Sequence, residues 1–289
     1  AWTHYAAPQT FYGLAGVCWK PLALLALALA LAGMWVGFMV APADAQQGEG
    51  YRIIFVHVPV SWMSMIIYLA MAFWGVVCLV FRARLAGMLS QALAPTGALF
   101  AFLSLWTGAL WGKPMWGAWW VWDARLTSEL ILFFLYIGFI ALTSAIQDPR
   151  RADRAGALVA IVGAVNVPII YFSVKWWNTL HQGASVSLTR SPSMAQTMLW
   201  GMLLMALACW VYALAIVLYR TRSLILQRER HADWVAQLPE LNPGLHRPEK
   251  AFERWLRNHL TERVTNHDKK APHLPTFLER CANTIASEI

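Results

Sequence analysis

The chain has 289 residues, of which 58% are hydrophobic and 13% are charged, and its formal net charge at pH 7 is +8. Soluble domains average about 25% charged residues, so this composition excludes an ordinary soluble globular protein and indicates a membrane protein. Residues 1–219 hold eleven Lys and Arg, whereas residues 220–289 alone hold twelve. Basic residues at the ends of membrane helices explain the positive charge without a nucleic-acid partner.

Six stretches are apolar over the roughly 20 residues that a helix needs to cross a bilayer. They lie near 21–41, 53–81, 92–110, 128–146, 156–174 and 196–219. Pro21 suits the first position of the first helix. Thr127 suits the N-cap of the fourth, with Glu129 in a first turn where the helix dipole favours an anion. We therefore predict an all-α, polytopic membrane protein with six transmembrane helices.

The orientation follows from the lysine and arginine residues near the ends of the spans. One set of ends carries eight of them: Lys20, Arg82, Arg84, Arg150, Arg151, Arg154, Arg220 and Arg222. The opposite set carries five: Arg52, Lys113, Arg125, Lys175 and Arg190. The excess predicts that both termini are cytoplasmic. It places the loop between the third and fourth spans in the periplasm.

The end of the chain is polar, charged and interrupted by five prolines: Pro239, Pro243, Pro248, Pro272 and Pro275. We therefore expect a six-helix membrane domain at residues 1–230 and a polar cytoplasmic C-terminal tail at residues 231–289. Apolar residues at helical spacing predict one amphipathic helix over 249–264. That helix fits a contact with a partner or, as we favour, an interfacial or solvated appendage.

Residues 111–127, called here the Trp-rich segment, hold five of the seventeen tryptophans: Trp111, Trp116, Trp119, Trp120 and Trp122. Tryptophan favours the membrane–water boundary because its large apolar ring carries one polar N–H. An aromatic belt that anchors a helix is therefore the simplest alternative. A belt does not require the breaks at Gly112 and Gly117, the turn at Pro114, or the charges of Asp123 and Arg125. We interpret the segment as a surface that holds a large planar ligand.

Only two of the eight histidines, His57 and His181, belong to the membrane body, and both fall on the side of the Trp-rich segment. Each alone fits an interfacial, hydrogen-bonded residue. Together with an aromatic surface they fit the axial ligands of an iron porphyrin. Its propionates need cations, and the sequence does not choose among Arg52, Lys113, Arg125, Lys175 and Arg190. The four cysteines form no Cys-x-x-Cys-His motif, so covalent c-type attachment of haem to this chain is not indicated.

The Trp-rich segment, WGKPMWGAWWVWDARLT, resembles the WWD signature of haem-handling membrane proteins. With APADAQQG at 41–48, YRIIFVHVP at 51–59 and VKWWNTLHQG at 174–183, the chain resembles the CcmC family, the C subunits of the cytochrome c maturation system. The resemblance covers residues 10–235 and the order of all six spans. The tail beyond residue 235 is longer than the family pattern.

This resemblance implies that the chain holds haem b (iron protoporphyrin IX) at the periplasmic face of the bacterial inner (cytoplasmic) membrane. His57 and His181 match the family's metal-ligand positions. The implied cofactor-binding set also includes Trp111, Trp116, Trp119, Trp120, Trp122, Asp123, Arg125, Lys113 and Arg52. Asp123 has two expected roles, an ion pair with Arg125 or a contact with a partner. We favour a structural role.

The implied function is to present haem to a periplasmic, CcmE-like haem chaperone, which forms its covalent bond while the haem is held. The implied partners are CcmA- and CcmB-like ABC transporter subunits, a small CcmD-like subunit and membrane lipid, with no nucleic acid. The chain has no Gly-x-x-x-x-Gly-Lys-Ser/Thr loop, so an ATP-driven step must come from a partner. We expect a binding and transfer protein with no catalytic residue.

Three other functions remain open at this point. A haem lyase would attach haem directly to apocytochrome c, but such relatives carry further spans and more histidines. A b-type cytochrome would bury histidine pairs within its spans, whereas His57 and His181 lie at outer ends. A transporter would move haem through its own bundle, yet apart from Glu129 the spans hold almost no ionisable residues.

Overall fold

The computed structural model describes residues 7–177, 179, 181, 186 and 191–238. The chain divides into two compact units, Ala1–Arg228 and Glu229–Ile289. The described part of the first unit is helical, apart from loops and one isolated bridge between Asp44 and Gly48. The described part of the second unit contains one short helix, α9 (Asp233–Ala236). The amphipathic helix predicted over 249–264 lies outside the described residues.

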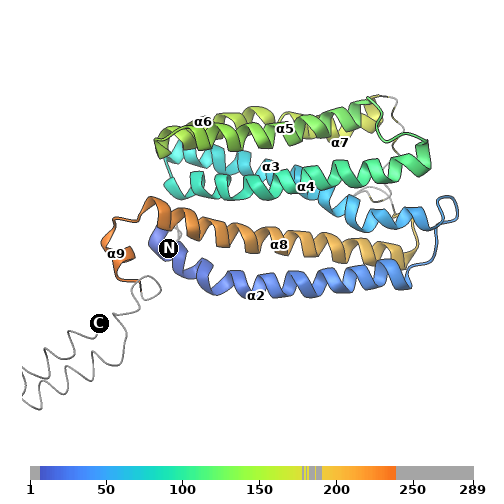
Figure 1. The fold of residues 1–289 in the computed structure, drawn as a ribbon, viewed down its shortest axis with the longest axis horizontal. Coiled ribbons are helices and arrows are strands. Elements are labelled where there is room, and N and C mark those ends of the chain that lie inside the picture. Colours follow the sequence, from blue (N-terminus) through green and yellow to red (C-terminus); the bar gives the residue numbers. More distant parts are fainter. Residues whose placement is uncertain (1–6, 178, 180, 182–185, 187–190, 239–289) are drawn as a thin grey trace, which may run out of the picture. The chain divides into compact units, whose positions relative to one another are not determined.

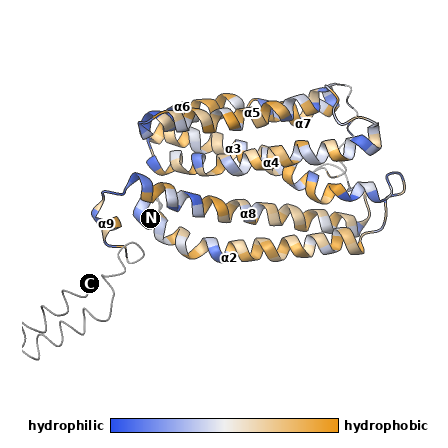
Figure 2. Ribbon diagram, in the orientation of Figure 1, coloured by the Kyte–Doolittle hydropathy of each residue, from blue (hydrophilic) through white to orange (hydrophobic). Residues whose placement is uncertain are grey.

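Six segments of the first unit are long and apolar enough to cross a membrane. They are α2 (Pro8–Trp35) with η1 (Val36–Val40), η2 (Glu49–Ile53) with α3 (Ile54–Phe81), α4 (Arg84–Trp116), α5 (Ala124–Ala145), α6 (Pro149–Gly163) with α7 (Asn166–Trp176), and α8 (Gln196–Arg228). Apolar residues cover most of the length of these helices (Figure 2). The prediction of an all-α, multi-pass membrane protein with six spans is confirmed.

The details of three helices differ from the prediction. The first helix begins at Pro8, so Pro21 lies inside it rather than at its start. The N-cap of α5 is Asp123, not Thr127, because the Asp123 carboxylate accepts a hydrogen bond from the Leu126 N–H at 2.8 Å. The predicted fifth span consists of two helices, α6 and α7, separated by a turn at 164–165. A hydropathy pattern locates apolar stretches, but it does not detect caps or turns within them.

The helices of the first unit pack as pairs (Figure 1). Helix α2 lies along α8, and α3 lies along α4. Helix α8 also contacts α3 and α4, which joins the two pairs, while α5, α6 and α7 pack on the other side of α3 and α4. The Trp-rich segment joins the end of α4 to the start of α5, and so lies at one end of this bundle.

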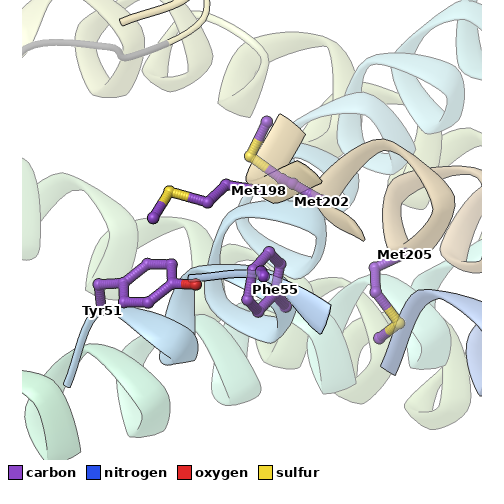
Figure 3. Close-up of a cluster of buried hydrophobic side chains, with 6 residues drawn as sticks. Tyr51, Phe55, Met198, Met202 and Met205 are labelled. Carbon is purple, nitrogen blue, oxygen red and sulfur yellow. The ribbon is translucent and has the colours of Figure 1, made fainter. Parts of the chain in front are cut away.

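Aromatic and sulfur-containing side chains fix the start of α3 against α8. Met198, Met202 and Met205 recur at helical spacing and form one buried cluster with Tyr51 and Phe55 (Figure 3). A close backbone approach supports this contact. A Cβ atom added at Gly201 would lie 3.2 Å from the backbone of Gly37 and 3.1 Å from the Phe55 ring. Small residues of this kind let membrane helices approach closely.

A buried ion pair ties three helices together at the end opposite to the Trp-rich segment. Arg228 of α8 donates to both carboxylate oxygens of Asp153 in α6, at 2.7 and 2.8 Å. Gln91 of α4 completes the cluster, because it accepts from Arg228 and donates to Asp153, both at 3.1 Å. The side chains of Asp153 and Arg228 are only 6% and 15% exposed. Removing one partner would therefore leave a buried charge unpaired.

We expect Asp153→Ala to destabilise the membrane unit by about 3 kcal/mol, the lower end of the cost of breaking a buried ion pair. The measurement is the thermal unfolding midpoint of the detergent-solubilised protein. Arg154→Gln is the matched control, because Arg154 is the exposed neighbour of Asp153. Equal midpoints for the two variants would show that the cluster contributes nothing to stability.

Candidate functional site

The Trp-rich segment begins as helix. Helix α4 continues through Gly112 and Pro114 to Trp116, so the break and the turn predicted at those two positions are wrong. The helix ends at Gly117, whose φ of 79° lies in the left-handed region, and whose N–H bonds to the Lys113 carbonyl at 3.0 Å. Glycine adopts this conformation without a steric cost, which is why it ends helices so often. Residues 118–123 then form an irregular loop that leads into α5.

The indoles of this segment meet edge to face rather than in one plane. Trp111 and Trp116 have ring centroids 4.9 Å apart at 81°, and Trp120 and Trp122 lie 5.3 Å apart at 77°. The Trp111 indole N–H donates to the side chain of Gln47 at 3.1 Å, which ties the loop before α3 to α4. Trp119 and Trp122 are 56% and 76% exposed. The segment therefore combines an inner aromatic wall with two outward-facing rings.

A pocket opens beside the inner wall, and it is lined by side chains from α3, α4, α5 and the connection between α7 and α8. It contains about 360 Å³ of empty space, including its opening. The lining residues are His57, Ser61, Ser104, Leu105, Gly108, Trp116, Arg125, Leu126, Glu129 and His181. The fold thus brings the two predicted histidines together in one pocket, with one of the predicted tryptophans and one of the predicted cations.

His57 lies in the first turn of α3 and is held by α4. Its Nδ1 is 2.9 Å from the Thr107 hydroxyl oxygen, and that hydroxyl already donates to the Leu103 carbonyl at 2.6 Å. The hydroxyl oxygen can therefore only accept, so the proton of His57 is on Nδ1 and Nε2 keeps its lone pair. Gly108 leaves room for the ring, because an added Cβ would lie 3.2 Å from its Cε1.

His181 faces Trp116 and Asp123. Its ring meets Trp116 at 4.9 Å and 71°, and its Nδ1 is 3.6 Å from Oδ2 of Asp123. That distance is too long for a hydrogen bond, and both atoms are buried without another hydrogen-bond partner among the described residues. Burial lowers the pKa of His181 below its usual value, the charge of Arg125 lowers it further, and Asp123 opposes both. The imidazole is therefore neutral at pH 7 and available as a metal ligand.

Geometry distinguishes the predicted cations. Arg125 lines the pocket, where it donates to the Ile170 carbonyl of α7 at 2.7 Å rather than pairing with Asp123. Arg52 pairs with Glu49 and donates to the Gly37 carbonyl at 2.6 Å. Lys113 is exposed, and its Nζ donates to the Gly117 carbonyl at 3.2 Å.

The two remaining cations are placed less directly. The Lys175 Nζ lies 5.6 Å from the centre of the Phe172 ring. Arg190 lies outside the described residues. Of the four cations that the structure describes, Arg125 is the one that lines the pocket.

Several pocket residues had no signal in the sequence. Gly108, Ser61 and Ser104 line the pocket, and Thr107 contacts His57 beside it. All four are small residues of apolar helices, and nothing in their local pattern marks them as part of a site. Ser61 and Ser104 meet across α3 and α4 through their hydroxyl groups. Glu129 was expected in the first turn of a helix starting at Thr127, but α5 starts at Ala124, and Glu129 is a buried pocket residue, 5% exposed.

The pocket has the chemistry of a site for a planar, metal-containing anion. Two neutral imidazoles offer two metal-ligand positions, so the ligand must bring its other donors itself. The Trp116 ring offers an apolar face, and the Arg125 guanidinium offers a partner for a carboxylate. Outside the pocket's lining, the indole N–H of Trp120 is buried without a hydrogen-bond partner among the described residues.

The sequence matches one protein family, heme exporter protein C, over residues 1–236. It is 47% identical to the heme exporter protein C of Haemophilus influenzae over 240 residues, which cover 83% of this chain and 98% of that protein. It is 45% identical to the Escherichia coli K12 protein of the same name over 237 residues, covering 81% and 94%. A ccmC-like mitochondrial protein of cytochrome c biosynthesis from Marchantia polymorpha is 51% identical over 174 residues, covering 60% of this chain and 70% of that protein. With its six membrane-spanning segments, the chain belongs to the heme exporter protein C family.

Proposed function

We propose that this protein binds haem b in the pocket between His57 and His181 and presents it to a periplasmic haem chaperone. The observation that carries the proposal is the meeting of these two histidines, 124 positions apart in sequence, in one pocket of a chain whose relatives are named for haem export. Haem iron has two axial positions for imidazoles, while the porphyrin fills the other four.

The acceptors beside both imidazoles favour the tautomer with the proton on Nδ1, which leaves Nε2 free to bind a metal. Thr107 Oγ1 accepts the Nδ1 proton of His57, and Asp123 Oδ2 lies on the Nδ1 side of His181. In each case Nε2 is the atom for iron, and an acceptor behind the ring fixes its tautomer. Closing the 3.6 Å gap between Asp123 and His181 needs only a small shift, which we expect when haem is bound.

Arg125 is the cation for one propionate. It is the pocket's guanidinium, and its bond to the Ile170 carbonyl holds it in place while leaving other N–H groups to donate. Arg52, Lys113 and Lys175 already contact other groups, which supports outer roles for them.

The exposed rings support presentation rather than enclosure. The roughly 360 Å³ of empty space at the pocket includes its opening to solvent, so the site is open rather than closed. Haem bound there by its iron would keep an edge outside the pocket. Trp119 and Trp122, together with the exposed Trp176 and Trp177, provide aromatic surface for that edge and for the chaperone.

The surroundings of the site complete the proposal. We place the Trp-rich segment on the periplasmic face of the bacterial inner membrane, with both termini and the tail from residue 231 in the cytoplasm. The partners are a CcmE-like chaperone, CcmA- and CcmB-like transporter subunits and a CcmD-like subunit. We assign no bond-breaking role to the side chains of the pocket. In this proposal, the chain holds the haem while the chaperone forms its covalent bond to it.

The test is a haem titration of the purified, detergent-solubilised protein, followed by addition of the chaperone. We expect a six-coordinate, low-spin visible spectrum, and then transfer of haem to the chaperone. A protein that binds no haem would refute the proposal. Attachment of haem to an apocytochrome c without the chaperone would instead establish the haem-lyase alternative.

A further inference from the structure

Glu129 is an acidic side chain buried inside a membrane span. It belongs to α5 and is only 5% exposed. It lines the same pocket as His57 and His181, and neither iron ligation nor propionate binding in the proposed function uses it. Ionisable groups within membrane spans are rare and generally functional, and the protonation state decides what such a group can do.

The contacts of Glu129 with α3 fit a protonated carboxyl group. The buried Ser64 hydroxyl oxygen lies 2.8 Å from Oε1 of Glu129 and also 2.8 Å from the Ser61 carbonyl oxygen. A hydroxyl group carries one proton, whereas a carbonyl and a carboxylate carry none. If Glu129 were ionised, one of these two contacts would join oxygen atoms with no proton between them. A protonated Glu129 supplies the second proton, so that both contacts are hydrogen bonds.

Ser104 of α4 also interacts with the Glu129 carboxyl group, and its proton is directed elsewhere. The Ser61 hydroxyl donates its proton to the His57 carbonyl at 2.7 Å. Because the Ser61 and Ser104 hydroxyl groups also meet, the proton between them comes from Ser104. Both serine hydroxyl groups beside Glu129 therefore donate to other oxygen atoms and can accept from the acid.

Arg125, the cation of the pocket, reaches a different helix. It precedes Glu129 by four residues on α5, so the two side chains lie on the same face. The Arg125 guanidinium nevertheless donates to the Ile170 carbonyl of α7 at 2.7 Å, whereas the Glu129 carboxyl group lies against Ser64 of α3. A buried charge without a partner is costly, so this separation also favours the neutral form of Glu129.

We propose that Glu129 is a neutral acid that leaves the charge of Arg125 available for a carboxylate of the bound haem, an inference that rests on the proposed function. An ionised Glu129 would attract the Arg125 guanidinium along the helix and repel the haem carboxylate. The neutral acid does neither, and it still joins α5 to α3 through Ser64. At about 10 Å and an effective dielectric constant of about 20, one unit charge changes an affinity on the order of tenfold.

The first measurement is the infrared spectrum of the full-length protein in detergent, before haem is added. A protonated carboxylic acid has a carbonyl stretching band at a higher frequency than the amide and carboxylate bands. We expect this acid band in the parent and its loss in Glu129→Gln. Glu49→Gln is the matched control and should keep the band, because Glu49 is 68% exposed and forms an ion pair with Arg52.

The second measurement is the ratio of the haem affinities of Glu129→Gln and the parent as the pH rises. Over the range in which the parent loses its acid band, its affinity should fall on the order of tenfold relative to that of the glutamine variant. If the band persists throughout, the ratio should stay constant. The other titratable groups that face the pocket or Glu129 are shared by both proteins and cancel in the ratio: Arg125, His57, His181, Asp123 and Tyr136.

The outcomes separate this inference from the proposed function. Absence of the band from the haem-free parent would refute the neutral acid. A constant ratio while the band is lost would refute its role toward Arg125, as would about tenfold tighter haem binding by Glu129→Gln at neutral pH. A parent protein that binds no haem would refute the proposed function, whereas the acid band, which is measured without haem, would still establish the protonation state of Glu129.

Discussion

Replacing either His57 or His181 with alanine is expected to abolish the six-coordinate, low-spin spectrum of bound haem and to reduce haem loading of the chaperone at least tenfold. Both side chains line the same pocket. In the proposed complex, each supplies one bond to the haem iron. Loss of an outer-shell partner alone typically costs about 10–100-fold in metal affinity, so loss of a ligand should cost no less. The visible spectrum of the titrated protein measures ligation, and a transfer assay measures loading.

Matched variants make this result specific. His231→Ala removes a histidine of the second compact unit that does not line the pocket, so it should behave as the parent does. Thr107→Val keeps His57 but removes the oxygen that accepts its Nδ1 proton, and an intermediate affinity is expected. Normal spectra and normal loading in both alanine variants would overturn the ligand assignment.

The six spans could be predicted from local composition. So could the position of the two histidines at the same end of the bundle as the Trp-rich segment. Each apolar stretch is long enough to recognise on its own, and the histidines lie next to such stretches. The partners of the histidines could not be predicted in this way. Thr107 is 50 positions from His57, and only the packing of α4 on α3 brings the two side chains together.

The role of Asp123 illustrates a second limit. Its closeness to Arg125 in sequence suggested an ion pair, but side chains two positions apart on a helix do not face each other. Asp123 caps α5, whereas Arg125 extends to the Ile170 carbonyl. Asp123 therefore has a structural role as a helix cap instead of the expected ion pair, and its second carboxylate oxygen lies 3.6 Å from Nδ1 of His181.

Two substitutions of Asp123 separate its role as a helix cap from its effect on the His181 ring. In Asp123→Asn, the amide oxygen should keep the hydrogen bond to the Leu126 N–H, because asparagine caps helices as well as aspartate does. Its NH₂ group would then face Nδ1 of His181, and it can only donate. The imidazole would have to accept there and protonate Nε2, so the atom needed for iron would lose its lone pair. Asp123→Ala loses the cap, at a cost of about 1 kcal/mol, but leaves the ring free to choose its tautomer.

The two variants should therefore rank in opposite orders for stability and for haem binding. Asp123→Asn should unfold near the parent temperature but bind haem about 10–100-fold more weakly, while Asp123→Ala should unfold earlier and bind better than Asp123→Asn. Raising the pH should not restore binding to the asparagine variant. Burial and Arg125 already lower the pKa of His181, and losing the Asp123 charge lowers it further, so the ring is neutral in any case. If haem affinity instead followed thermal stability in both variants, Asp123 would act on the site only by capping α5.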